Sequence, residues 1–111
     1  MKTRLMRLRI LEELELLSSP SAQLDYEASL TKAGHAPTEL IAGYCDDLFN
    51  PKDPAFVADF SNDELKELSH LYGLMQDAFS TPPATVSDML KSPGWRKVIS
   101  FAKDLREQLK A

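Results

Sequence analysis

Apolar residues recur at steps of three and four along nearly the whole chain, and this spacing most constrains what the chain can fold into. Such a period places the apolar side chains on one side of an α-helix. No segment alternates apolar and polar residues for long enough to predict a β-strand. The pattern predicts helices over residues 3–17, 20–33, 37–49, 62–79, 86–90 and 93–110. The expected fold is all-α, a single compact domain of about five to six helices in bundle-like or orthogonal packing.

The apolar stripes of the first and last helices are the most regular. The last helix is expected to bury Trp95, Val98, Ile99, Ala102, Leu105 and Leu109. The first is expected to bury Leu5, Leu8, Leu11 and Leu14, with Met6, Ile10 and Leu17 beside them.

Serine, glycine and proline mark the ends of these helices. Residues 61–64, Ser-Asn-Asp-Glu, form a capping box, in which the side chains of Ser61 and Glu64 each accept a hydrogen bond from the other's backbone amide. Gly34 is expected to end the second helix. Two prolines in residues 51–60 predict a short extended or turning loop before the capping box.

Composition indicates one domain in a reducing compartment. The chain has 111 residues, 43% of them hydrophobic, which suffices for the core of a single domain spanning residues 1–111. The one cysteine, Cys45, cannot form a disulfide within the chain, and this favours the cytoplasm. Arg7 and Glu12 interrupt the stretch that a signal peptide would need. No apolar run approaches the ~20 residues of a membrane span.

Charge is distributed unevenly along the chain. The net charge of −4 argues against general binding to nucleic acid, which relies on lysine and arginine at phosphates. Residues 39–67 hold eight acidic side chains against two lysines, a net charge of −6, whereas the rest of the chain is slightly basic. A nucleic-acid-binding regulator would therefore have to use the basic start of the chain, with Lys2, Arg4, Arg7 and Arg9 as its contacts.

No metal site is expected. Asp59, Ser61 and Asp63 have the spacing of the first ligands of an EF-hand loop, but that motif needs Gly where Glu64 stands and Glu where His70 stands. The two histidines are far apart in sequence and only one cysteine is present, so no zinc-binding spacing occurs.

No enzymatic activity or cofactor is expected either. The sequence contains no nucleophile motif and no glycine-rich phosphate loop. Cys45 lies on the apolar stripe of its helix, as a buried and unreactive thiol would. Asp46 and Asp47 are adjacent, so on a helix they point about 100° apart and do not form an acid–base pair.

Several carboxylates in the acidic segment have no obvious local role. The capping box accounts for Glu64, but Asp46 and Asp47 lie in the last turn of a predicted helix, where the helix dipole disfavours anions. Asp53 and Asp59 have no capping role that local spacing reveals. Because aromatic residues are interleaved with these aspartates, the segment is interpreted either as a surface for a basic partner protein or as an ordinary solvated surface.

Two stretches of the chain, which lie within residues 44–109, resemble a family. They are "YCDDLFNPKDPAFVADFSNDELKELSHLYGLM" from residue 44 and "SPGWRKVISFAKDLREQL" from residue 92. Their acidic and aromatic helix end, P-x-D-P-x-F loop, Phe-Ser-capped helix and closing W-R-x-V helix resemble small helical bacterial immunity proteins of contact-dependent and other polymorphic toxin systems.

The resemblance implies a cytosolic inhibitor without enzymatic activity that binds one cognate toxin domain, often a basic nuclease, and blocks it. Similarity and charge together select the candidate partner contacts Tyr44, Asp46, Asp47, Asp53, Asp59 and Glu67. The alternative is a homo-oligomeric structural or regulatory module, in which the basic ends of one copy meet the acidic middle of another. A monomer is the favoured oligomeric state.

Overall fold

The computed structural model describes residues 4–30 and 34–110. These residues contain seven helices and no strand: α1 (Leu5–Leu17), α2 (Pro20–Ser29), α3 (Ala36–Cys45), α4 (Pro54–Val57), α5 (Asn62–Ala78), α6 (Val86–Leu90) and α7 (Pro93–Lys110). The all-α class that the apolar spacing predicts is confirmed. The expected extended or turning loop contains a single helical turn, α4, which adds one helix to the predicted set.

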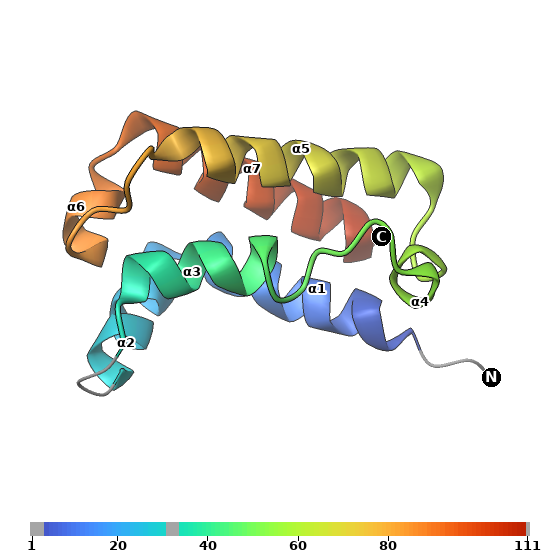
Figure 1. The fold of residues 1–111 in the computed structure, drawn as a ribbon, viewed down its shortest axis with the longest axis horizontal. Helices are drawn as coiled ribbons and strands as arrows, with labels where there is room; N and C mark the ends of the chain where they lie inside the picture. The colour runs from blue at the N-terminus through green and yellow to red at the C-terminus, as the bar shows by residue number, and fades with distance from the viewer. Residues whose placement is uncertain (1–3, 31–33, 111) are drawn as a thin grey trace.

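Three long helices make the body of the molecule. α5 and α7 lie side by side, and α1 packs along α7 (Figure 1). α3 lies across α1 and also contacts α5, whereas α2 and α6 contact each other at one end of the molecule. The turn of α4 lies at the other end, close to the start of α1. The result is a short bundle of 41 × 27 × 24 Å.

The core follows the apolar stripes of the helices. In α7 the predicted stripe is confirmed, because Trp95, Val98, Ala102, Leu105 and Leu109 are buried and Ile99 is partly buried. In α5 the buried side chains are Leu68, Leu71 and Met75. Trp95 is the largest of the fully buried side chains.

The stripe predicted for α1 is wrong at the start of the helix. Leu5 is 49% exposed and Leu8 is 53% exposed, whereas Ile10, Leu14 and Leu17 are fully buried. The helix is rotated so that Arg7, one turn before Ile10, points toward the body of the molecule. The rotation lets Arg7 form an ion pair with Glu64. The spacing of apolar residues does not reveal this ion pair, and so it cannot predict the rotation. The predicted start at residue 3 lies outside the described residues.

The helix ends confirm the capping box and correct two other expectations. The Ser61 side chain accepts from the Glu64 amide at 3.1 Å, and the Glu64 carboxylate accepts from the Ser61 amide at 2.8 Å. Gly34 does not end the second helix, because α2 stops at Ser29 and passes into an extended residue. α3 ends at Cys45, four residues earlier than expected.

A buried polar side chain joins α1, α2 and α7. Gln23 on α2 is fully buried, and its amide nitrogen donates to the carbonyl oxygens of Leu16 and Leu17 at 3.1 and 3.0 Å. Its amide oxygen accepts from the indole nitrogen of Trp95 at 2.9 Å. Gln23 thus satisfies two carbonyls at the end of α1 and the one polar atom of the largest core side chain.

Candidate partner-binding surface

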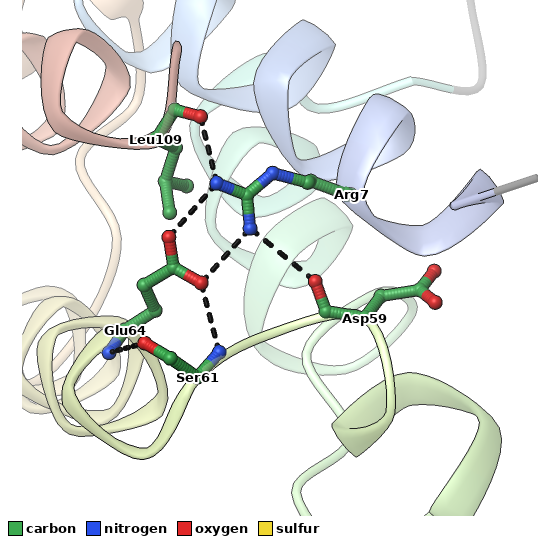
Figure 2. Close-up of polar contacts among 5 residues, drawn as sticks. All are labelled: Arg7, Asp59, Ser61, Glu64 and Leu109. Atoms are coloured by element: carbon green, nitrogen blue, oxygen red, sulfur yellow. Dashed lines mark hydrogen bonds and ion pairs between the residues drawn. The ribbon is translucent and has the colours of Figure 1, made fainter. Parts of the chain in front are cut away.

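Arg7 takes part in a polar cluster at the place where three helices meet (Figure 2). Its Nη1 donates to Glu64 Oε1 at 2.9 Å and to the Asp59 carbonyl oxygen at 3.3 Å. Its Nη2 donates to Glu64 Oε2 at 2.8 Å and to the Leu109 carbonyl oxygen at 2.8 Å. Arg7 therefore connects α1 with the start of α5 and the end of α7.

The contacts in this cluster shift the pKa values of Glu64 and Arg7. The hydrogen bonds from Arg7, together with those from Ser61, lower the pKa of Glu64 to about 2 against the opposing effect of burial. The hydrogen bond to Glu64 also raises the pKa of Arg7. The guanidinium is therefore occupied within the fold. The basic face of the nucleic-acid hypothesis loses Arg7 as a free contact, and Lys2 lies outside the described residues.

Asp59 is a structural residue, which corrects its interpretation as a partner contact. Its side chain is buried, and Oδ2 accepts from the Met6 amide at 2.9 Å. The residue at the N-cap of α1, Arg4, provides no side-chain cap. Asp59 therefore supplies, from 53 residues away, the acceptor that a helix start needs.

Tyr44 is not a surface residue, and its candidacy as a partner contact fails for that reason. Its side chain is fully buried, and the hydroxyl donates to the Leu68 carbonyl oxygen at 2.6 Å. The ring stacks on Phe49, with the ring centres 5.5 Å apart. Tyr44 joins α3 to α5 within the core.

Asp53 and Glu67 are half-buried. The Asp53 side chain accepts from the Ala55 amide at 3.0 Å and so caps α4, which gives it the local role that its spacing did not reveal. Glu67 lies on α5, beside the buried Leu68. Neither residue is as accessible as the two aspartates that precede them.

Asp46 and Asp47 are exposed and lie just beyond the C-terminal end of α3. Both backbone amides donate to the Ala42 carbonyl oxygen, at 2.9 and 3.0 Å. They therefore follow the negative end of the helix dipole directly, whereas the sequence predicts them inside the last turn of the helix. In this position the charges do not stabilise the helix to which they belong.

Glu13 is the residue of the surface that sequence reasoning missed. Its half-buried side chain extends from α1 toward α3, and a Cβ atom at Gly43 would lie only 3.2 Å from Glu13 Oε1. Burial raises the pKa of Glu13, and the charge of Asp47 raises it further. The sequence indicates the burial of Glu13 only through its position next to Leu14 and one turn after Ile10, two of the buried residues of α1.

Glu13 lines a pocket of about 310 Å³ between α1 and the end of α3. The pocket is lined by Arg9, Glu12, Glu13, Gly43, Asp47 and Leu48, and it is called the acidic pocket below. Among the described residues, no ion pair involves Glu13, Asp46 or Asp47. The pocket therefore gathers three carboxylates and one guanidinium, that of Arg9, and neither Glu13 nor Asp47 forms an ion pair among the described residues.

The two histidines and the cysteine take part in contacts within the fold. His35 caps α3 by accepting from the Thr38 amide, and the ring of His70 lies 4.7 Å from that of Phe101. Cys45 is buried, and this burial raises its pKa, which disfavours a reactive thiolate. Across residues 4–30 and 34–110, no group of three or more His, Cys, Asp or Glu side chains is arranged to hold a metal ion.

Comparison with known proteins yields no match. No family model, no curated protein and no solved structure is similar to the chain. In the part of the chain that the structure describes, no helix has both the length and the apolar character needed to cross a membrane.

Replacing Glu13 with Gln is expected to raise the free energy of unfolding at pH 7 by a few tenths to about 1 kcal/mol. Gln keeps the shape of the side chain and removes a charge that burial and Asp47 oppose. Because the folded state raises the pKa of Glu13, ionisation costs stability above that pKa, and the cost disappears as the pH falls to the ordinary value of 4.5. Urea denaturation should therefore show a benefit at pH 7 that vanishes near pH 4.

Glu12→Gln is the matched control for this prediction. Glu12 is exposed, is adjacent in sequence and lines the same pocket. Its replacement should leave stability unchanged at both pH values. Equal effects of the two substitutions would show that burial of Glu13 plays no part.

Proposed function

We propose that the chain is a cytosolic immunity protein that binds and neutralises a cognate bacterial toxin domain, such as a basic nuclease. The surface assigned to the toxin consists of the exposed Asp46 and Asp47 and the adjoining acidic pocket. The observation that carries the proposal is the half-buried Glu13, which faces Asp47 and forms no ion pair among the described residues, with Arg9 as the one cation of the pocket lining.

Electrostatic cost is the physical reason for assigning the partner to this surface. Glu13, Asp46 and Asp47 carry like charges, and the C-terminal end of α3 adds its partial negative charge. A lysine or arginine from a partner would relieve this repulsion and would gain strong hydrogen bonds from carboxylates. An acidic surface would also accelerate the approach of a basic domain.

The proposal uses fewer contacts than the sequence suggests and keeps the same kind of partner. Asp59 and Asp53 cap helices and Tyr44 lies in the core, so the proposed contacts are Asp46, Asp47 and the newly found Glu13, with the half-buried Glu67 of α5 kept as a candidate. The acidic and aromatic stretch that resembles immunity proteins thus has two parts, a folded core and an exposed acidic edge. The proposed mode of action is occupation of a basic cleft by this edge, in place of a nucleic-acid substrate.

Reversal of both exposed aspartates to lysine is expected to slow association with the toxin domain by about tenfold or more at low salt. The test ligand is the toxin domain that the proposal expects to be encoded beside the gene for this chain. Stopped-flow mixing measures the association rate, and co-expression measures whether the chain restores the growth of cells that produce the toxin. The loss should shrink as ionic strength rises.

Asp104→Lys combined with Glu107→Lys is the matched control. These two acids are exposed on α7, and their reversal changes the net charge by the same amount. The control should associate at nearly the wild-type rate. Equal rates for the two double variants would rule out a local acidic site, and failure of the wild-type chain to restore growth would rule out immunity.

A further inference from the structure

The outer side of α1 has an ordered pattern of exposed residues. Every exposed residue from the start of the helix to its last turn belongs to one row: Arg4, Leu5, Leu8, Arg9, Glu12 and Glu15. The basic members occupy the first half of the row and the acidic members occupy the second. At one end of the row Glu15 forms an ion pair of 3.8 Å with Arg106 of α7, and Arg9 and Glu12 border the acidic pocket beside α3.

Two leucines lie within this row. Leu5 and Leu8 are one turn apart and each is about half exposed, at 49% and 53%. The remaining large hydrophobic side chains with comparable exposure, Leu24 and Tyr72, are on α2 and α5. Because Leu5 and Leu8 are neighbours on one face, they form an apolar patch, whereas the other two occur singly.

The order of charges along this row is self-complementary, because reversing the direction of the helix exchanges its basic half and its acidic half. If a second copy of α1 lies antiparallel to the first, the basic half of each helix faces the acidic half of the other. A two-fold axis produces this arrangement, and every contact then occurs twice. The antiparallel arrangement also places opposite ends of the two helix dipoles together.

We infer that the outer face of α1 is a self-association surface whose partner is a second copy of this chain. In the arrangement that the charges favour, Arg9 of each copy faces Glu12 of the other, and Leu5 faces the half-buried Leu16. The apolar patch is far smaller than the ~800 Å² per partner of a stable interface. The dimer is therefore weak, and its population depends on protein concentration and ionic strength.

Sedimentation equilibrium of the isolated protein tests this inference. The wild-type chain should form a reversible dimer in the micromolar to millimolar range at low ionic strength. Leu8→Glu should weaken dimerisation by roughly tenfold or more. The matched control, Leu24→Glu, changes a leucine of similar exposure on α2 and should leave the dimer unaffected. Circular dichroism establishes that each variant is folded.

A charge exchange tests the antiparallel arrangement itself. Arg9→Glu and Glu12→Arg should each weaken self-association, because each leaves like charges facing one another. A mixture of these two variants should form a heterodimer, since opposite charges then face across the axis. The double variant R9E/E12R should regain the wild-type affinity for its own copy.

Three results would overturn the inference: a monomer at every concentration, a dimer that Leu8→Glu leaves intact, or a mixture that fails to form the heterodimer. Arg9 and Glu12 also border the acidic pocket, so these measurements are made without any toxin. The inference does not rest on the proposed function. If the chain does not dimerise, the toxin-binding proposal is unaffected. If the chain does dimerise, toxin binding is still not established.

Discussion

Replacing Arg7 with Met is expected to lower the free energy of unfolding by about 2–4 kcal/mol, measured by urea denaturation at pH 7. The substitution removes the cation that faces Glu64 and leaves the carbonyl oxygens of Asp59 and Leu109 without their donor. The side chains of Arg7 and Glu64 are only 16% and 17% exposed, so water compensates little for the loss. Met retains the apolar stem of arginine, which limits the change in packing.

Arg4→Met is the matched control. Arg4 is exposed, lies one turn before Arg7 and contributes no side-chain hydrogen bond to the start of α1. Its replacement should change stability by less than about 0.5 kcal/mol. A comparable loss in the two variants would show that the charge of the N-terminal segment matters, and not the particular contacts of Arg7.

The pH dependence of the Arg7 effect is also defined. In the fold the pKa of Glu64 is about 2, compared with an ordinary value of 4.5. A carboxylate with a lowered pKa contributes stability that is present above pH 4.5 and is lost as the pH falls to about 2. Arg7→Met removes the main cause of the shift. The difference in stability between wild type and variant should therefore be largest near neutrality and narrow across this acid range.

The fold was predictable where local rules decide it. The stripe of α7 from Trp95 to Leu109 and the capping box of Ser61 and Glu64 depend on spacing within one helix, and both are confirmed. In α1 the apolar pattern does not determine which side of the helix is buried. Its leucines are spread around the helix. Two rotations of α1 about its axis would therefore bury nearly the same number of apolar residues. The contacts of Arg7 with residues more than 50 positions away select between them.

The candidate site was predictable only in part, for a related reason. A carboxylate with no local cap can still cap a helix that is distant in sequence, as Asp59 does for Met6 and Glu27 does for the Val86 amide at 2.9 Å. Unexplained charge therefore indicates a partner only after remote caps are assigned. Among the described residues, Asp46 and Asp47 cap no remote helix, and they are therefore kept as proposed contacts. Glu13 becomes visible only when α3 is seen to lie across α1 at Gly43.

Replacing Gln23 with Leu is expected to cost about 2–4 kcal/mol of unfolding free energy, although the change fills the same volume with an apolar group. The Leu17 carbonyl oxygen and the indole nitrogen of Trp95 would lose their partner in a buried place, and the Leu16 carbonyl oxygen would keep only the Ser19 amide at 3.3 Å. A buried polar group without a partner costs about 1–3 kcal/mol. Hydrophobic gain from Leu offsets only part of this loss.

Gln108→Leu serves as the matched control, because Gln108 is exposed on α7 and its replacement should leave stability nearly unchanged. Trp95 is the only tryptophan of the chain, so its fluorescence reports directly on the altered contact. In the folded Gln23→Leu variant, the emission should shift to shorter wavelength, because the indole loses its hydrogen bond. A variant with wild-type stability and unchanged emission would mean that Gln23 neither supports the end of α1 nor holds the indole.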